Sequence, residues 1–133
     1  MVGVMASWDA VREIALALPQ TSERVSRQKL QWRVKDKLFV WERPLRPKEI
    51  EELGPGAPSG PILGARVEHL VAKEALLAAD PDVYFTTSHF DGYAAILARL
   101  EQISTPELEE LITEAWLARA TGPLVKSYLG KDR

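Results

Sequence analysis

The sequence predicts an α+β fold in which a β-sheet packs one face against a helix from each end of the chain. Three observations support this prediction: an amphipathic helical pattern near the N-terminus, another near the C-terminus, and a period-2 alternation typical of strands between them. The chain has 133 residues, of which 46% are hydrophobic and 27% charged. A chain of this size fits a single domain, residues 1–133, that buries roughly two thirds of its unfolded surface.

The first helix is predicted to follow Ser7, because serine caps helix N-termini by accepting a backbone hydrogen bond. Pro19 ends the pattern, since proline has no backbone N–H and clashes with the preceding turn. Between these two residues the apolar side chains recur at helical spacing and form one stripe: Trp8, Val11, Ile14, Ala15 and Leu18.

Residues 30–41 predict a basic, aromatic β-hairpin after a polar link. Leu30, Trp32 and Val34 alternate with polar residues, which is typical of a strand with one buried face. A tight loop is expected at Asp36 and Lys37.

The length of that loop decides how the two strands pair. A two-residue loop pairs Val34 with Phe39 and Trp32 with Trp41, so that the aromatic rings share one face. A three-residue loop pairs Trp32 with Val40 instead, and the choice determines whether Trp41 is core or exposed. The sequence mildly favours the first register.

Residues 44–61 form a Pro/Gly-rich insert that holds five of the nine prolines of the chain. Residues 47–53 predict a short helix, with proline in its first turn and Gly54 just beyond its end. Residues 55–61 are expected to be a mobile surface loop.

The next segment alternates between strands and short turns. Residues 62–67 predict a strand, residues 72–79 a brief helix, and residues 83–87 a second strand that residues 88–92 end as a turn. Residues 93–103 are ambiguous, because their apolar positions fit helical spacing and also alternate. The local pattern favours a helix there.

The last long helix is predicted to begin with Thr105 as its cap and Pro106 at its first position, and to stop at Gly122 and Pro123. Acidic residues fill its first turn, as the helix dipole favours. One side of the helix is apolar: Leu108, Leu111, Ile112, Ala115 and Trp116.

This order of elements resembles the YjbR/MmcQ-like family. The residues that carry the resemblance are 15–19 with Thr21 and Glu23, 32–34, 37–39, 76–87, 89–93, 99–100, 108–111 and 115–116. The resemblance implies a fold close to that of frataxin (CyaY-like), a strand over residues 94–100, and a DNA-binding "double wing" protein. With that strand, the prediction is an antiparallel sheet of about five strands packed against the N- and C-terminal helices.

Positive charge is concentrated around the hairpin. Residues 23–48 contain nine Lys and Arg against three Asp and Glu, a local balance of +6, whereas the whole chain has a net charge of −2. The remainder therefore carries −8, much of it in residues 101–114, and this asymmetry could orient an anionic partner toward the hairpin. The leading hypothesis is non-catalytic nucleic-acid binding through phosphate contacts from Arg27, Lys29, Arg33, Lys35 and Lys37.

The alternative hypothesis is a protein-interaction or adaptor domain whose contact surface includes Ile50, Leu53, Ile62 and Leu63. An enzyme is not expected. Ser88, His89 and Asp91 are the one concentrated group of catalytic residue types, but residues adjacent in sequence rarely converge on one substrate atom. The Gly-rich nucleotide motifs and the nucleophile elbow are absent from the sequence.

No cofactor or metal is expected. The two histidines, His69 and His89, are 20 residues apart and lack metal-ligand spacing, and the first helix offers only Asp9 and Glu13 for an acidic iron-binding ridge. The chain has no cysteine, no apolar run of membrane-spanning length, and no signal-peptide pattern in residues 1–5. The sequence therefore predicts a cytoplasmic protein without membrane contact.

Overall fold

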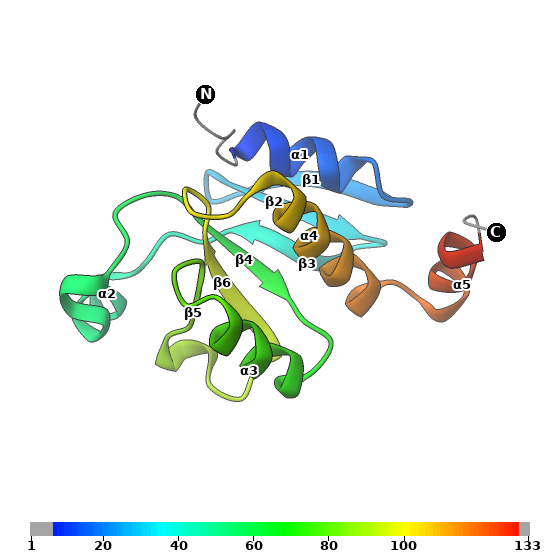
Figure 1. Cartoon of the computed structure of the whole chain (residues 1–133). Coiled ribbons are helices and arrows are strands. Elements are labelled where there is room, and N and C mark those ends of the chain that lie inside the picture. The colour runs from blue at the N-terminus through cyan, green and yellow to red at the C-terminus, as the bar shows by residue number, and fades with distance from the viewer. Residues whose placement is uncertain (1–6, 131–133) are drawn as a thin grey trace, which may run out of the picture.

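A computed structural model describes residues 7–130, which form a six-stranded antiparallel sheet in the order β1-β2-β3-β4-β6-β5 (Figure 1). The strands are β1 (Thr21–Ser26), β2 (Lys29–Val34), β3 (Lys37–Glu42), β4 (Ile62–Arg66), β5 (Tyr84–Phe85) and β6 (Ala95–Arg99). The helices are α1 (Trp8–Leu16), α2 (Pro47–Leu53), α3 (Leu70–Ala79), α4 (Thr105–Arg119) and α5 (Gly122–Gly130), with short 3₁₀ turns η1 (Gly54–Gly56) and η2 (Ser88–Phe90). The predicted α+β class is confirmed.

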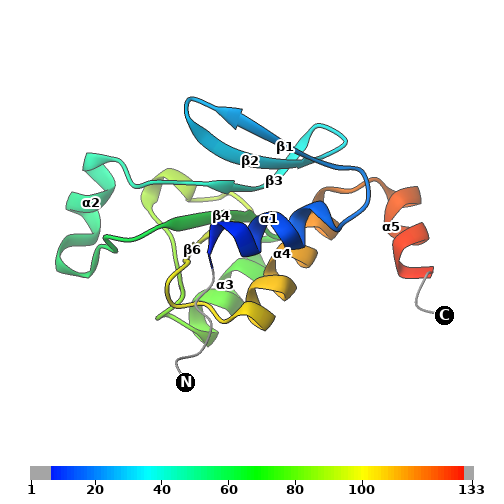
Figure 2. The same cartoon turned by 90° about the horizontal axis from the view of Figure 1, so that it is seen from above.

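Both terminal helices lie on one face of the sheet, where they form the main core (Figure 2). The predicted apolar side of α4 is confirmed, because Leu108, Leu111, Ile112, Ala115 and Trp116 are all buried. The Trp116 indole also donates a hydrogen bond of 3.0 Å to the Pro19 carbonyl, which ties α4 to the end of α1. On this face α4 contacts β3 and β4, and α1 contacts β1.

A smaller core covers the opposite face of β4 and β6. Ile62, Phe85, Phe90, Ala95 and Leu97 are buried there, and Trp41, Leu45 and Leu53 pack against them. Because both faces are covered, four consecutive residues of β6 are buried, and the strand shows no alternation of apolar and polar residues. The local preference for a helix over residues 93–103 was therefore wrong, and the strand implied by the family resemblance is confirmed.

One of the two predicted helix caps is confirmed, and the other lies one residue from its predicted position. The Ser7 side chain accepts a hydrogen bond of 3.3 Å from the Ala10 amide, as predicted. At α4 the cap is Ser104 and not Thr105, since the Ser104 hydroxyl accepts from the Glu107 amide at 3.3 Å and Thr105 is already helical. The predicted helix over residues 47–53 is confirmed as α2.

Two elements have no clear pattern in the sequence. β1 replaces the predicted polar link, because an edge strand with four exposed residues does not need an apolar period of two. α5 follows the predicted stop at Gly122, and Leu124, Val125 and Tyr128 pack against the core, with the Tyr128 and Trp116 ring centroids 4.9 Å apart.

Residues 1–5, where no signal peptide is predicted, lie outside the described residues. Within residues 7–130, no helix combines the length and the apolar character needed to cross a membrane.

Candidate nucleic-acid interface

Strands β1, β2 and β3 form a meander joined by two tight turns. Arg27 and Gln28 link β1 to β2, and Lys35 and Asp36 link β2 to β3. All four have positive φ, between 46° and 69°, as a two-residue type I′ turn requires. The second turn therefore lies one residue before the predicted loop at Asp36 and Lys37.

The register of β2 and β3 combines features of the two alternatives. Trp32 pairs with Val40, as in the three-residue alternative, although the loop has only two residues. The extra residue is accommodated by a register shift between Trp32 and Arg33. The favoured pairing of Trp32 with Trp41 was wrong. Because of the shift, Trp32 faces the main core while Trp41 packs in the smaller core on the other face.

The five predicted contact residues fall into two groups at opposite ends of β2. Arg27 and Lys29 lie at its start, whereas Arg33, Lys35 and Lys37 lie around the second turn. The six residues of β2 span roughly 20 Å from one turn to the other. The structure thus places three of the five residues around one turn and the other two at the far end of the same ribbon. Lys37 pairs with the buried Val34, so it lies on the opposite face of the ribbon from Arg33.

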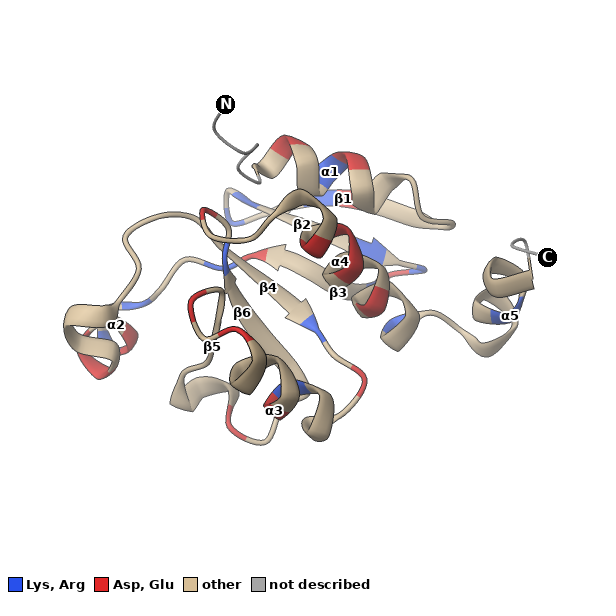
Figure 3. Ribbon diagram, viewed as in Figure 1, with Lys and Arg blue, Asp and Glu red and all other residues tan. Residues whose placement is uncertain are grey.

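Lys29, Gln31 and Arg33 alternate with the buried positions of β2, so they face away from the main core. Arg24 of β1 pairs with Gln31 and lies on the same face. The long helices lie on the other side, and Figure 2 shows that no helix in residues 7–130 covers the outward face of β1 and β2. Figure 3 shows cationic residues on these strands and acidic residues on α4 across the sheet.

Hydrogen bonds position two of the arginines. Arg33 donates from Nε and Nη2 to the Gln31 side-chain oxygen, at 3.3 and 3.0 Å, and from Nη1 to the Asp36 carbonyl at 2.9 Å. Arg24 forms an ion pair with the Asp36 carboxylate. Lys35 and Lys37 are exposed and make no ion pair within residues 7–130. The Lys35 and Lys37 ammonium groups are therefore free to contact a ligand, while the Arg24 and Arg33 side chains are fixed by hydrogen bonds within the meander.

The two hairpin tryptophans differ in exposure: Trp32 is buried in the main core, whereas Trp41 is partly buried and pairs with Gln31 on the outward face. Trp32 is fully buried, and its indole donates to Glu23 at 2.9 Å. Glu23 also accepts from Arg12 at 2.8 Å, and this bond lowers the pKa of Glu23 below its usual value. Trp41 lies against Gly64 in the smaller core. Contacts from this face would be made mainly by charged and polar groups, with the partly buried Trp41 beside Gln31.

The residues 88–91 do not form an assembled catalytic triad. Ser88 donates from its hydroxyl to Glu52 at 2.8 Å, and its amide donates to the same carboxylate at 2.9 Å. The His89 ring packs edge-on against Phe90, at 4.9 Å between centroids. No side-chain hydrogen bond among the described residues joins Ser88, His89 and Asp91. The segment is held as a turn against α2.

Two of the residues predicted for a protein-contact surface are buried. Ile62 and Leu63 lie inside β4 with 3% and 0% exposure, and Leu53 packs on the smaller core. Only Ile50 is largely exposed, so that predicted surface does not exist as a patch. The sequence could not show that Ile62 and Leu63 are both buried, because their burial depends on packing against both faces of β4.

The histidines have separate surroundings. His69 caps α3 by accepting a hydrogen bond from the Ala72 amide at 3.1 Å, and His89 belongs to the turn at residues 88–90. In the part of the chain that the structure describes, no group of three His, Cys, Asp or Glu side chains could hold a metal ion.

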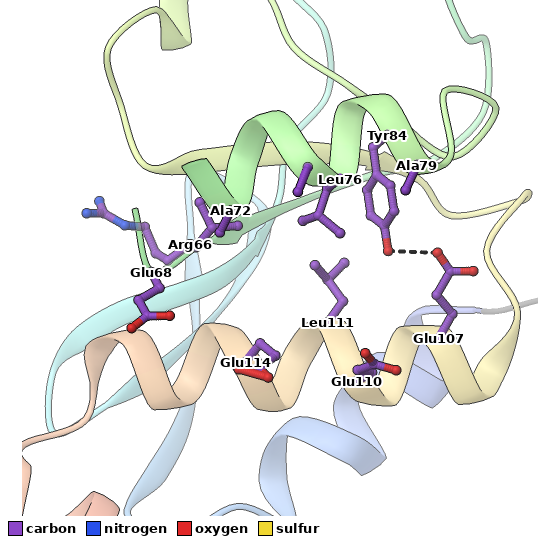
Figure 4. Close-up of a pocket in the computed structure, with 12 residues that line it drawn as sticks. Arg66, Glu68, Ala72, Leu76, Ala79, Tyr84, Glu107, Glu110, Leu111 and Glu114 are labelled. Atoms are coloured by element: carbon purple, nitrogen blue, oxygen red, sulfur yellow. Dashed lines mark hydrogen bonds between the residues drawn. The ribbon is translucent and has the colours of Figure 1, made fainter. Parts of the chain in front are cut away.

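A groove between α3 and α4 was missed in the sequence. Tyr84 donates to Glu107 across it, at 2.9 Å between the hydroxyl and Oε2 (Figure 4). Burial and this hydrogen bond raise the pKa of Tyr84 well above its usual value. The spacing of Glu107, Glu110 and Glu114 around the buried Leu111 was the available signal, but it matches any solvated helix face equally well.

The fold and the meander define a class: a small α+β domain with a helix-covered antiparallel sheet and an uncovered cationic ribbon at one edge. The chain matches the family model YjbR over residues 16–118, and it belongs to the YjbR family. It is 51% identical to uncharacterized protein Mb2600 of Mycobacterium bovis and to uncharacterized protein Rv2570 of Mycobacterium tuberculosis, over 96% of this chain and 99% of each relative.

The fold is also similar to a crystal structure, that of Deinococcus radiodurans protein DR2400, a DUF419 domain. The TM-score is 0.62 with 16% sequence identity, over 85% of this chain and 78% of that chain. A similarity at this level of identity establishes the architecture.

Proposed function

We propose that this protein is a non-catalytic nucleic-acid-binding domain that contacts phosphates through the β1–β2–β3 meander, and that it acts in the cytoplasm. The observation that carries the proposal is the outward face of β2, where Lys29 and Arg33 project on the side that no described helix covers. Arg27 and Lys35 extend the same charge to the two turns. DNA is the leading partner.

The charge distribution supports an anionic partner on this side. Residues 21–42 contain six Lys and Arg against three Asp and Glu, and Glu23 and Glu42 are engaged in hydrogen bonds within the domain. The four glutamates of α4 lie across the sheet (Figure 3). A polyanion would therefore be attracted to the meander and repelled from α4.

The geometry fits the phosphate backbone better than the bases. The two cationic groups are roughly 20 Å apart, which corresponds to about six phosphates along one strand of a duplex. Trp32 is buried in the main core and cannot stack on bases, and Trp41 is partly buried against the smaller core. Phosphate contacts carry little sequence information, and we expect weak sequence preference.

The test is a fluorescence-anisotropy titration of labelled duplex and single-stranded DNA at two salt concentrations. One double variant, Lys35→Asn with Lys37→Gln, removes two charges at the second turn, and another, Arg27→Asn with Lys29→Gln, removes two at the first. Asparagine is chosen at Lys35 and Arg27 because it tolerates their positive φ. We expect each double variant to bind about tenfold more weakly and to lower the salt slope by roughly 1.8.

A matched control, Lys48→Gln with Lys126→Gln, removes the same charge from exposed positions outside the meander. It should leave the affinity within about twofold. The proposal would be overturned by an absence of DNA binding at low salt, or by a control that weakens binding as much as the meander variants do.

A further inference from the structure

The groove between α3 and α4 has the properties of a peptide-binding site. It encloses ≈ 580 Å³, and side chains from α3 and α4 face one another across it (Figure 4). Its floor is apolar, formed by Val67, Ala72, Ala75, Leu76, Ala79 and Leu111. A concave apolar surface of this size at a helix–helix junction is typical of a binding site.

One wall of the groove is acidic. Glu107, Glu110 and Glu114 line it from successive turns of α4, and Glu68 adds a carboxylate from the link before α3. None of the four pairs with a Lys or Arg within residues 7–130, although Glu68 lies 3.7 Å from His69 Nε2 and Glu107 accepts the Tyr84 hydroxyl. Glu110 and Glu114 are four residues apart, where like charges destabilise an isolated helix.

A cation lies at one end only. Arg66 sits beside Glu68, and its Nε is buried without a hydrogen-bond partner among the described residues. Burial, followed by repulsion from Arg119, lowers the pKa of Arg66 below its usual value. The acidic part of the groove therefore lies toward Glu107 and Glu110.

We propose that this groove binds a basic amphipathic helix of a partner protein. The carboxylates are spread over about 10 Å of α4, the rise of seven helical residues. A small amine could meet one or two of them, whereas a helix with Lys or Arg at i, i+4 and i+7 beside an apolar stripe meets them all and fills the floor. The groove lies across the sheet from the outward face of β2, so a peptide bound there leaves that face accessible.

The probe is a synthetic 15-residue peptide with three leucines at helical spacing flanked by lysines, compared with a scrambled peptide of the same composition. Binding is measured by calorimetry and by methyl chemical shifts of the full-length protein. We expect the amphipathic peptide to shift Val67, Leu76 and Leu111 and to bind at least fivefold more tightly than the scrambled one.

Two variants locate the site. Glu110→Gln with Glu114→Gln should weaken binding roughly tenfold, because two charge pairs are lost. Glu101→Gln with Glu109→Gln removes the same charge from exposed residues that do not line the groove, and should change affinity less than twofold. Ala75→Phe places a ring on the exposed edge of the floor and should also weaken binding, with the thermal midpoint confirming that the variant is folded.

Equal binding of the scrambled peptide, equal effects of the two glutamate pairs, or chemical shifts outside the groove would overturn the proposal. Two further arms test other occupants. If n-octylamine shifts the same methyl resonances in a saturable titration and the peptide does not bind, the groove is a site for a small amine. Concentration-dependent self-association that Ala75→Phe abolishes would assign it to a second copy of this chain.

Discussion

Arg43 and Glu49 form a buried, bidentate ion pair, with Nη1–Oε1 at 2.9 Å and Nη2–Oε2 at 2.8 Å. Glu49 also accepts from the Thr87 hydroxyl at 2.8 Å and from the Arg46 amide at 2.9 Å. This carboxylate thus joins the end of β3, α2 and the segment after β5. Arg43 belongs to the basic run of residues 23–48 but is only 8% exposed, so it serves the fold of the insert.

Glu49→Gln should destabilise the protein by about 3 kcal/mol, because it leaves the buried Arg43 guanidinium without a counter-charge. Urea unfolding followed by tryptophan fluorescence measures the loss. Glu51→Gln, an exposed change in the same helix, should stay within about 0.5 kcal/mol of the wild type. Similar losses for the two variants would show that the ion pair has no special role.

The pH dependence of stability should report the same carboxylate. Burial alone would raise the pKa of Glu49, but hydrogen bonds from Arg43, the Arg46 amide and Thr87 outweigh it and lower the pKa from 4.5 to about 2. A group whose pKa is lower in the folded state stabilises the fold above its unfolded pKa and loses that effect as the pH falls. Wild-type stability should therefore drop by about 3 kcal/mol more than that of Glu49→Gln between pH 5 and pH 2. Parallel curves for the two proteins would contradict this assignment.

Gly64→Ala should destabilise the sheet by roughly 1 to 3 kcal/mol through overpacking. A Cβ at Gly64 would overlap the Trp41 ring, only 2.7 Å from its Cζ2 and Nε1 atoms. The double variant Gly64→Ala with Trp41→Leu should be less destabilised than the sum of the two single changes, because removing the ring removes the clash. A double-mutant cycle from urea unfolding measures this, and strict additivity would mean that the two residues do not meet.

Gln28→Gly should stabilise the protein by about 0.5 to 1 kcal/mol. Gln28 has a φ of 67° in the turn between β1 and β2, where glycine meets no steric cost. Ser26→Gly, two residues earlier in β1, is the control. It should destabilise the protein, because glycine increases the conformational entropy of the unfolded chain and position 26 is not part of the turn. The thermal midpoints of both variants test this, and a lower midpoint for Gln28→Gly would contradict the turn geometry.

The candidate interface was predictable in composition but not in layout. The sequence identified Arg33, Lys35 and Lys37 as neighbours on a hairpin, and they do surround one turn. It could not place Arg27 and Lys29 at the other end of the same ribbon, because the strand preceding them has no apolar alternation. The groove between α3 and α4 was also out of reach, since α3 and α4 are far apart in the sequence and meet only in the folded chain.

The sequence by itself determined the α+β class, the cap of α1, the apolar sides of α1 and α4, and the charge asymmetry between the meander and α4. These depend on residues a few positions apart, whose spacing is fixed by the helical and strand repeats. Tertiary structure overrode the local helical pattern of residues 95–99, and it alone decided that Trp41 faces the smaller core and that Arg43 is buried. Each of these outcomes depends on what covers the second face of the sheet, and no local pattern encodes a neighbour that arrives from a distant part of the chain.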